Sequence, residues 1–118
     1  MRDYRKYEVW QKLHEVTLHI YKNIIPVFPK SEQFELTGQL KRAAYSIPFN
    51  IVEGCGRNTD KDFVHFLDIA LGPCHEVEYC ALLASDLGYI DKDNYDKLSE
   101  MINGIKVKLI KLIKSIRK

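Results

Sequence analysis

Apolar residues recur every three or four positions in four separate segments of this 118-residue chain, and this spacing limits the fold more than any other feature. Side chains three and four residues apart lie on one face of an α-helix, so each segment predicts a helix with one apolar side. No segment shows the alternation typical of a strand, and the sequence therefore predicts an all-α protein. The predicted apolar faces are Val9, Leu13, Val16, Ile20 and Ile24; Leu36, Leu40, Ala44, Ile47 and Ile51; Phe63, Phe66, Leu67, Ala70, Cys74, Val77, Ala81 and Ala84; and Leu98, Ile102, Ile105, Leu109, Leu112 and Ile116.

Helix-ending and helix-capping residues separate the four segments. Short connections between long helices place successive helices side by side in opposite directions. The chain therefore predicts an antiparallel up-down-up-down four-helix bundle that occupies residues 1–118 as a single domain. The predicted boundaries are Pro26 and Pro29 after the first helix, Ser31 as N-cap of the second, Thr59 as N-cap of the third, Gly88 at its end, and Asp91 before the fourth.

The segment 46–57, with the sequence SIPFNIVEGCGR, carries a proline and two glycines between two helical patterns. Pro48 predicts a bend within a helix that continues through about Val52, because the apolar face continues beyond the proline. Gly54 and Gly56 are predicted to end this helix with positive φ angles, which cost little at glycine. A second proline, Pro73, predicts a local kink in the third helix.

Polar residues within this segment have a structural interpretation. Asn50 is expected to satisfy backbone groups near the proline, and a Glu53–Arg57 ion pair is expected to tie the turn together.

The same residues resemble a family signature. The pattern SIPxNIxEGxGR, an acidic and aromatic helix start, and the run Ile69-Ala70-Leu71-Gly72 are similar to the four-helix-bundle proteins encoded in intervening sequences of bacterial 23S rRNA genes. That family includes the accessory variability proteins of diversity-generating retroelements. The resemblance implies a four-helix bundle, and the accessory proteins imply a homo-oligomer, with a ring-like homopentamer favoured. Pro73 departs from the pattern, since the family more often has a small polar residue there.

The fourth helix carries apolar residues beyond its heptad seam. Val107, Ile110 and Ile113 form a second apolar line beside the first. Either the bundle itself covers this line or a second subunit does, and the resemblance favours a subunit interface.

Positive charge is concentrated near the C-terminus. Residues 104–118 hold six basic residues and no acidic one, which leaves 12 basic and 16 acidic residues elsewhere, so a segment of charge +6 follows a body of charge −4. Cations near a helix C-terminus also interact favourably with the helix dipole, so a solvated helix face is one explanation. The other is a multivalent surface that binds the phosphate backbone of RNA or DNA. The six residues are Lys106, Lys108, Lys111, Lys114, Arg117 and Lys118.

Three further basic residues, Lys41, Arg42 and Arg57, are candidates for nucleic-acid contacts, with ordinary surface charge as the alternative. The N-terminus interleaves basic residues with Tyr4 and Tyr7. These tyrosines either stack on bases or pack against the bundle.

No catalytic or metal-binding motif is present in the sequence. The four histidines are scattered, and the pair His75-Glu76 lacks the second histidine of a zinc-binding helix. Three cysteines without paired spacing predict reduced thiols. No run of residues is apolar enough for a signal peptide or a membrane span. We therefore expect a cytoplasmic protein that is not an enzyme, with no metal, cofactor or membrane partner.

Two functional interpretations follow. The favoured one is a non-enzymatic, nucleic-acid-associated adaptor, whose oligomeric basic surface holds RNA, DNA or a nucleic-acid enzyme such as a reverse transcriptase. The alternative is an oligomeric protein–protein scaffold without nucleic-acid binding.

Overall fold

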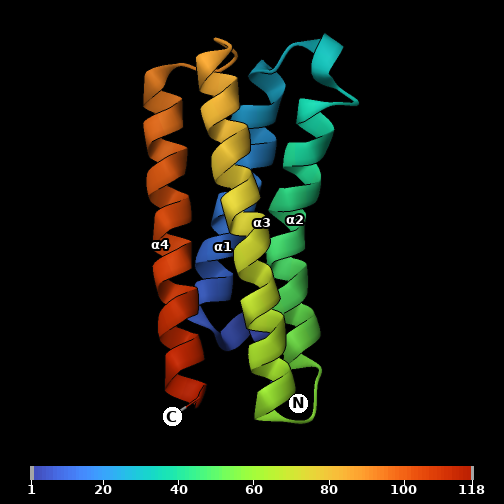
Figure 1. Cartoon of the computed structure of the whole chain (residues 1–118), viewed down its shortest axis with the longest axis vertical. Coiled ribbons are helices and arrows are strands. Elements are labelled where there is room, and N and C mark those ends of the chain that lie inside the picture. The colour runs from blue at the N-terminus through green and yellow to red at the C-terminus, as the bar shows by residue number, and fades with distance from the viewer. Residues whose placement is uncertain (1, 118) are drawn as a thin grey trace.

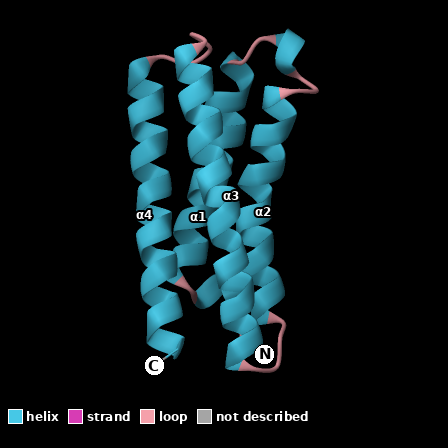
Figure 2. Ribbon diagram, viewed as in Figure 1, coloured by secondary structure: helices cyan, strands magenta, loops and turns pink. Residues whose placement is uncertain are grey.

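Four long helices lie along the 44 Å axis of the molecule in a computed structural model that describes residues 2–117 (Figure 1). Turns join them at alternate ends of the bundle, and residues 2–117 contain no strand (Figure 2). The prediction of an all-helical protein with four helices is confirmed. The helices are α1 (Glu8–His19), α2 (Leu36–Cys55), α3 (Asp60–Asp86) and α4 (Lys92–Arg117), with short turns η1 (Tyr4–Lys6), η2 (Ile20–Ile24, π-helical), η3 (Ile25–Val27) and η4 (Lys30–Glu32).

The predicted apolar faces form one continuous core. α3 packs most extensively, against both α2 and α4, and α1 closes the bundle against the same two helices. Phe63 and Leu67 of α3 are completely buried, as are Leu13 of α1, Ile47 of α2 and Ile102 of α4. Burial of such side chains contributes about 1.5–3 kcal/mol each, which makes these faces the main source of stability.

The start of α2 differs from the prediction. Ser31 lies in η4 and does not cap α2. The Glu32 carboxylate accepts the Leu36 N–H at 3.3 Å instead, and its second oxygen accepts the Tyr89 hydroxyl at 2.8 Å. Because Tyr89 comes from the α3–α4 connection, a tertiary contact fixes the carboxylate that caps this helix.

At the end of α2, the prediction for Pro48 is confirmed and the prediction for the two glycines is wrong. α2 continues through Pro48 as far as Cys55. However, Gly54 and Gly56 have no positive φ, and Gly56 has a φ of −80°. Gly54 is required by close packing, since a Cβ there would lie 2.9 Å from Cβ of Phe66.

The ends of α3 agree with the prediction. The Thr59 side chain accepts the Asp62 N–H at 3.1 Å, and α3 then runs through Pro73 without a break. Gly88 follows with a φ of 77°, and the Tyr89 N–H returns to the Ala84 carbonyl at 2.8 Å. This is the left-handed helix end that glycine favours.

α4 is less apolar on its outer side than predicted. After Leu109 the next buried residue is Ile113, while Leu112 and Ile116 are only partly buried. The heptad seam is therefore wrong at its end, because a straight helix drifts away from a strict seven-residue repeat. Ile113 belongs to the core, and Val107 and Ile110 are 52% and 40% exposed.

None of the helices described in residues 2–117 combines the length and hydropathy needed to cross a membrane.

Candidate nucleic-acid interface

Half of the predicted cationic segment is neutralised by acidic residues of other helices. Lys106 Nζ lies 2.6 Å from Glu78 Oε1 of α3, and both side chains are mostly buried. Lys108 pairs with Glu8 of α1, and its side-chain hydrogen bond lowers the pKa of that carboxyl. The segment has no acidic residue of its own, but α1 and α3, which pack against it, supply acidic partners.

Arg117 pairs with Asp68 of α3. Lys111 and Lys114 are exposed and make no ion pair with any residue in the described range 2–117. Lys118 lies outside the described residues. Within residues 104–117, Lys111 and Lys114 are therefore the cations that keep an unpaired charge available to a phosphate.

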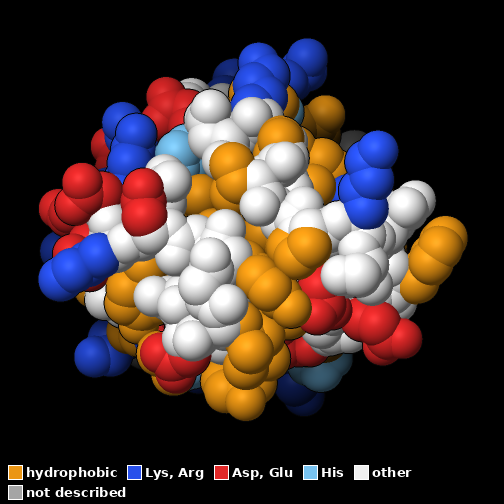
Figure 3. Space-filling view, turned by 90° about the horizontal axis from the view of Figure 1, so that it is seen from above, with side chains coloured by type: hydrophobic (Ala, Val, Ile, Leu, Met, Phe, Trp, Pro, Cys, Tyr) orange, Lys and Arg blue, Asp and Glu red, His pale blue; other side chains and the backbone are white. Residues whose placement is uncertain are grey.

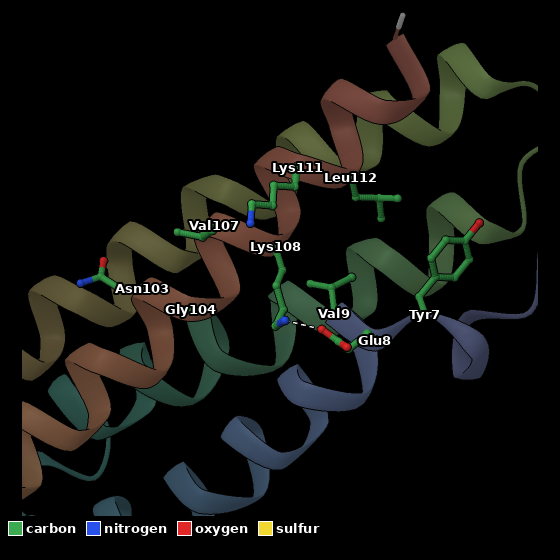
Figure 4. Close-up of a pocket in the computed structure, with 9 residues that line it drawn as sticks. All are labelled: Tyr7, Glu8, Val9, Asn103, Gly104, Val107, Lys108, Lys111 and Leu112. Atoms are coloured by element: carbon green, nitrogen blue, oxygen red, sulfur yellow. Dashed lines mark hydrogen bonds and ion pairs between the residues drawn. The ribbon is translucent and has the colours of Figure 1, made fainter.

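A groove of about 640 Å³ lies between α1 and α4, beside Lys111 (Figure 4). Gly104 leaves space in its wall, since no atom lies within 4 Å of where a Cβ would be. The Lys108–Glu8 pair crosses from one helix to the other within this groove. The groove thus combines apolar walls with a basic edge. Its lining residues are Tyr7, Glu8, Val9, Asn103, Gly104, Val107, Lys108, Lys111 and Leu112.

Of the second group of basic candidates, Lys41 and Arg42 lie on α2 and Arg57 lies in the turn that follows it, and α2 is on the opposite side of the bundle from α4 in Figure 1. The structure therefore does not join Lys41, Arg42 and Arg57 to the cations of α4 in one surface. Arg42 is exposed and donates a hydrogen bond to the neutral side chain of Gln39 at 3.1 Å, so its charge is not compensated by that contact.

The structural interpretation of the signature segment is confirmed. Arg57 pairs with Glu53 at 2.9 Å and lies over the ring of Phe66, 4.7 Å from its centroid. The Asn50 side chain donates to the Ser46 carbonyl at 2.8 Å, next to the proline.

The N-terminal aromatic residues pack against the bundle. Tyr4 contacts Trp10 edge to face at 4.9 Å, and Tyr7 contacts Phe63 at 5.7 Å between ring centroids. Arg2 pairs with Asp60 and lies over the Phe63 ring. These contacts anchor the N-terminal turn and leave little aromatic surface there for base stacking.

The three cysteines are buried and unpaired. Burial raises the pKa of each thiol, and that of Cys74 to about 12. Thiolates are the reactive form of cysteine, so none of these side chains has the properties of a nucleophile. Within residues 2–117, His, Cys, Asp and Glu side chains do not gather in groups of three that could hold a metal ion.

Sequence reasoning missed two exposed aromatic side chains on α2, Tyr45 and Phe49. The signal was available: the residues are four apart, and both lie off the predicted apolar face of that helix. Tyr45 follows the basic pair Lys41 and Arg42 by about one turn of helix, and Phe49 follows it by about two.

Comparison with known proteins adds two similarities. The model of the family of 23S rRNA-intervening sequence proteins matches residues 5–111. The crystal structure of a protein of unknown function from the S23 ribosomal protein family of Bacteroides thetaiotaomicron is 29% identical and has a TM-score of 0.82. That similarity covers 90% of this chain and 98% of the other. No curated protein matches the chain.

Proposed function

The chain belongs to the family of 23S rRNA-intervening sequence proteins, and from this membership we propose that it is a non-enzymatic, nucleic-acid-associated adaptor. In this proposal an oligomer of four-helix bundles presents basic side chains to RNA or DNA, or to an enzyme that acts on them, such as a reverse transcriptase. The affinity comes from phosphate contacts, with little reading of base sequence.

One observation carries the proposal. Lys111 and Lys114 project from the outer side of α4, while the ion pairs of Lys106, Lys108 and Arg117 hold the neighbouring cations to the bundle. Two free cations in a single chain bind a polyanion weakly. Repeated in each subunit of an assembly, they release more counterions and raise the apparent affinity.

The proposal includes a homo-oligomer, with five subunits favoured, and an antiparallel up-down-up-down order of helices. The alternating connections in Figure 2 and the course of the chain in Figure 1 support that order. The exposed Val107 and Ile110 of α4 support an apolar contact between subunits. The apolar surface they offer is smaller than the sequence pattern indicates, because Ile113 is buried in the core. We assign the protein no catalytic role and place it in the cytoplasm.

A protein–protein scaffold is the second candidate function. Phe34 is 85% exposed and lines a groove together with Tyr79 and Leu87, which are also exposed. Hydrophobic side chains also appear between the charged ones on this end of the molecule (Figure 3). Glu32, Glu35 and Arg42 line the same groove, so its net charge is negative, which favours a protein over a nucleic acid as the partner.

Salt-dependent RNA binding separates the two functions. We would measure fluorescence anisotropy of a labelled 20-nucleotide single-stranded RNA and of an RNA duplex, from 50 to 200 mM salt. The variant K111E/K114E should bind more weakly and show a flatter salt dependence, by about 0.7 in log–log slope for each phosphate of the single strand that it no longer neutralises. This variant keeps the Lys106–Glu78 and Lys108–Glu8 ion pairs.

The control K30E/K97E makes the same change in net charge at exposed lysines near the other end of the bundle. It should bind RNA more nearly like the unmodified protein. Equally weakened binding by the two variants would show that net charge, and not the surface around Lys111 and Lys114, determines binding. If the unmodified protein binds neither RNA at 50 mM salt, the adaptor function is wrong and the scaffold replaces it.

Native mass spectrometry tests the assembly. A mass five times that of the 13.8 kDa chain is expected at micromolar concentration. A mass of one chain under mild buffer conditions would remove the multivalency on which the proposed affinity depends.

A further inference from the structure

The outer side of α2 carries a pair of exposed aromatic rings. Phe49 is 66% exposed and Tyr45 is 41% exposed. Their ring centroids are 5.8 Å apart and the rings are nearly perpendicular, at 87°. Each ring supports the other without burying it, and the pair is held on a rigid helix.

A third aromatic residue lies beside this pair. Tyr21 belongs to the π-helical turn η2 at the end of α1 and is 38% exposed. Its pKa is raised first by partial burial and then by the neighbouring Tyr45 phenol. Tyr21 thus adds a half-exposed phenol from a π-helical turn, and such turns are frequent at functional sites.

Basic side chains flank the aromatic pair. Lys41 and Arg42 precede Tyr45 by four and three residues, which places them on the same side of the helix, one turn away. α2 contains one acidic residue, Glu53, and its charge is matched by Arg57. The outer side of α2 is therefore aromatic and net positive.

We propose that single-stranded RNA binds along this side of α2, with unpaired bases stacked on Phe49 and Tyr45 and phosphates held by Lys41 and Arg42. The inference rests on the proposed adaptor function and adds a second site, on another side of the bundle from Lys111. Stacking needs bases that are not paired, and it tolerates any sequence because every base has a π-face. From Arg42 to its end at Cys55, α2 spans roughly 20 Å, enough for several nucleotides.

The charge around the rings favours this ligand over a protein partner. Two other exposed aromatic residues, Phe34 and Tyr79, line a groove whose charged side chains are Glu32, Glu35 and Arg42, so that groove is net negative. The α2 pair instead follows Lys41 and Arg42 on one side of the helix, and the one acidic residue of α2, Glu53, is paired with Arg57.

The test is the affinity of the full-length protein for a fluorescein-labelled 12-nucleotide single-stranded oligouridine at 50 mM salt. The variant Y45A/F49A removes exposed rings, so the fold is retained, and the affinity should fall by about tenfold or more. The control F34A/Y79A removes two rings that are more exposed, at 85% and 62%, from the net negative groove and should leave the affinity within about twofold. An RNA duplex should bind the unmodified protein and Y45A/F49A equally, because its bases are not available for stacking.

A second variant reports the contact directly. F49W should retain the affinity, and oligouridine should quench its tryptophan emission. The same titration of the unmodified protein gives the change in emission from Trp10 alone, and the quenching of F49W should exceed that change.

Each contrary result has a distinct meaning. If the unmodified protein binds oligouridine but Y45A/F49A binds equally well, the α2 site is wrong while the adaptor function stands. If the unmodified protein binds no RNA, both are wrong. If Y45A/F49A changes the native mass and F49W shows no quenching by RNA, the α2 surface is an interface between copies of the chain and the inference is overturned.

Discussion

Gly54 should tolerate no side chain, because α3 lies directly against its backbone. A Cβ built on Gly54 lies 2.9 Å from Phe66 Cβ, 3.1 Å from Phe63 Cδ1 and 3.3 Å from the Phe63 carbonyl oxygen. Phe63 is completely buried, so its ring has no free space in which to move. G54A must therefore separate the two helices or force Phe63 out of its preferred conformation.

The magnitude follows from two opposing effects. Overpacking a core by one methyl group costs about 1–3 kcal/mol. Replacing glycine by alanine within a helix stabilises it by about 0.5–1 kcal/mol. G54A should therefore lower the free energy of unfolding by up to about 2.5 kcal/mol.

Gly104 provides the matched control. It lies within α4, is exposed, and has no atom within 4 Å of its Cβ position. G104A should keep only the helical gain of about 0.5–1 kcal/mol. The two variants make the same chemical change, so their difference of about 1–3 kcal/mol isolates the packing effect.

Urea denaturation followed by circular dichroism measures both variants, with the unmodified protein as reference. Thermal midpoints should separate by about 3–5 °C for each kcal/mol in a domain of this size. If G54A is as stable as G104A, the close approach of α2 to Phe63 is not rigid and the reasoning is refuted.

Three further predictions concern other parts of the bundle. Thiol reagents at pH 8 should label none of the three buried cysteines in the native protein and all three in urea, because burial raises the pKa of Cys74 to about 12 and shields it; rapid native labelling would show that the core opens. E78Q should destabilise the fold by about 1 kcal/mol, since it leaves the mostly buried Lys106 without its partner, and K106M/E78Q should recover part of that stability in a double-mutant cycle. G88A should cost about 1–2 kcal/mol in urea denaturation, because a φ of 77° is unfavourable for alanine, and an unchanged midpoint would mean that the turn adopts another conformation.

The sequence alone determined the helical architecture, because its information is local. Most of the periodic apolar residues of the four helices are buried, and Thr59 and Gly88 mark the ends of α3 as predicted. Capping bonds and helix periodicity depend on residues within about one turn of each other, so a single segment contains the needed signal.

Tertiary structure decided what depends on residues distant in the chain. The sequence shows a run of basic residues in α4, but Glu8 and Glu78, 100 and 28 positions away from the lysines they contact, neutralise part of it. The role of Gly54 was likewise fixed by Phe63 and Phe66 of another helix, and not by its own φ. Charge and packing act through space, so which cations remain free, and which glycine has no room for a side chain, are set only when the helices come together.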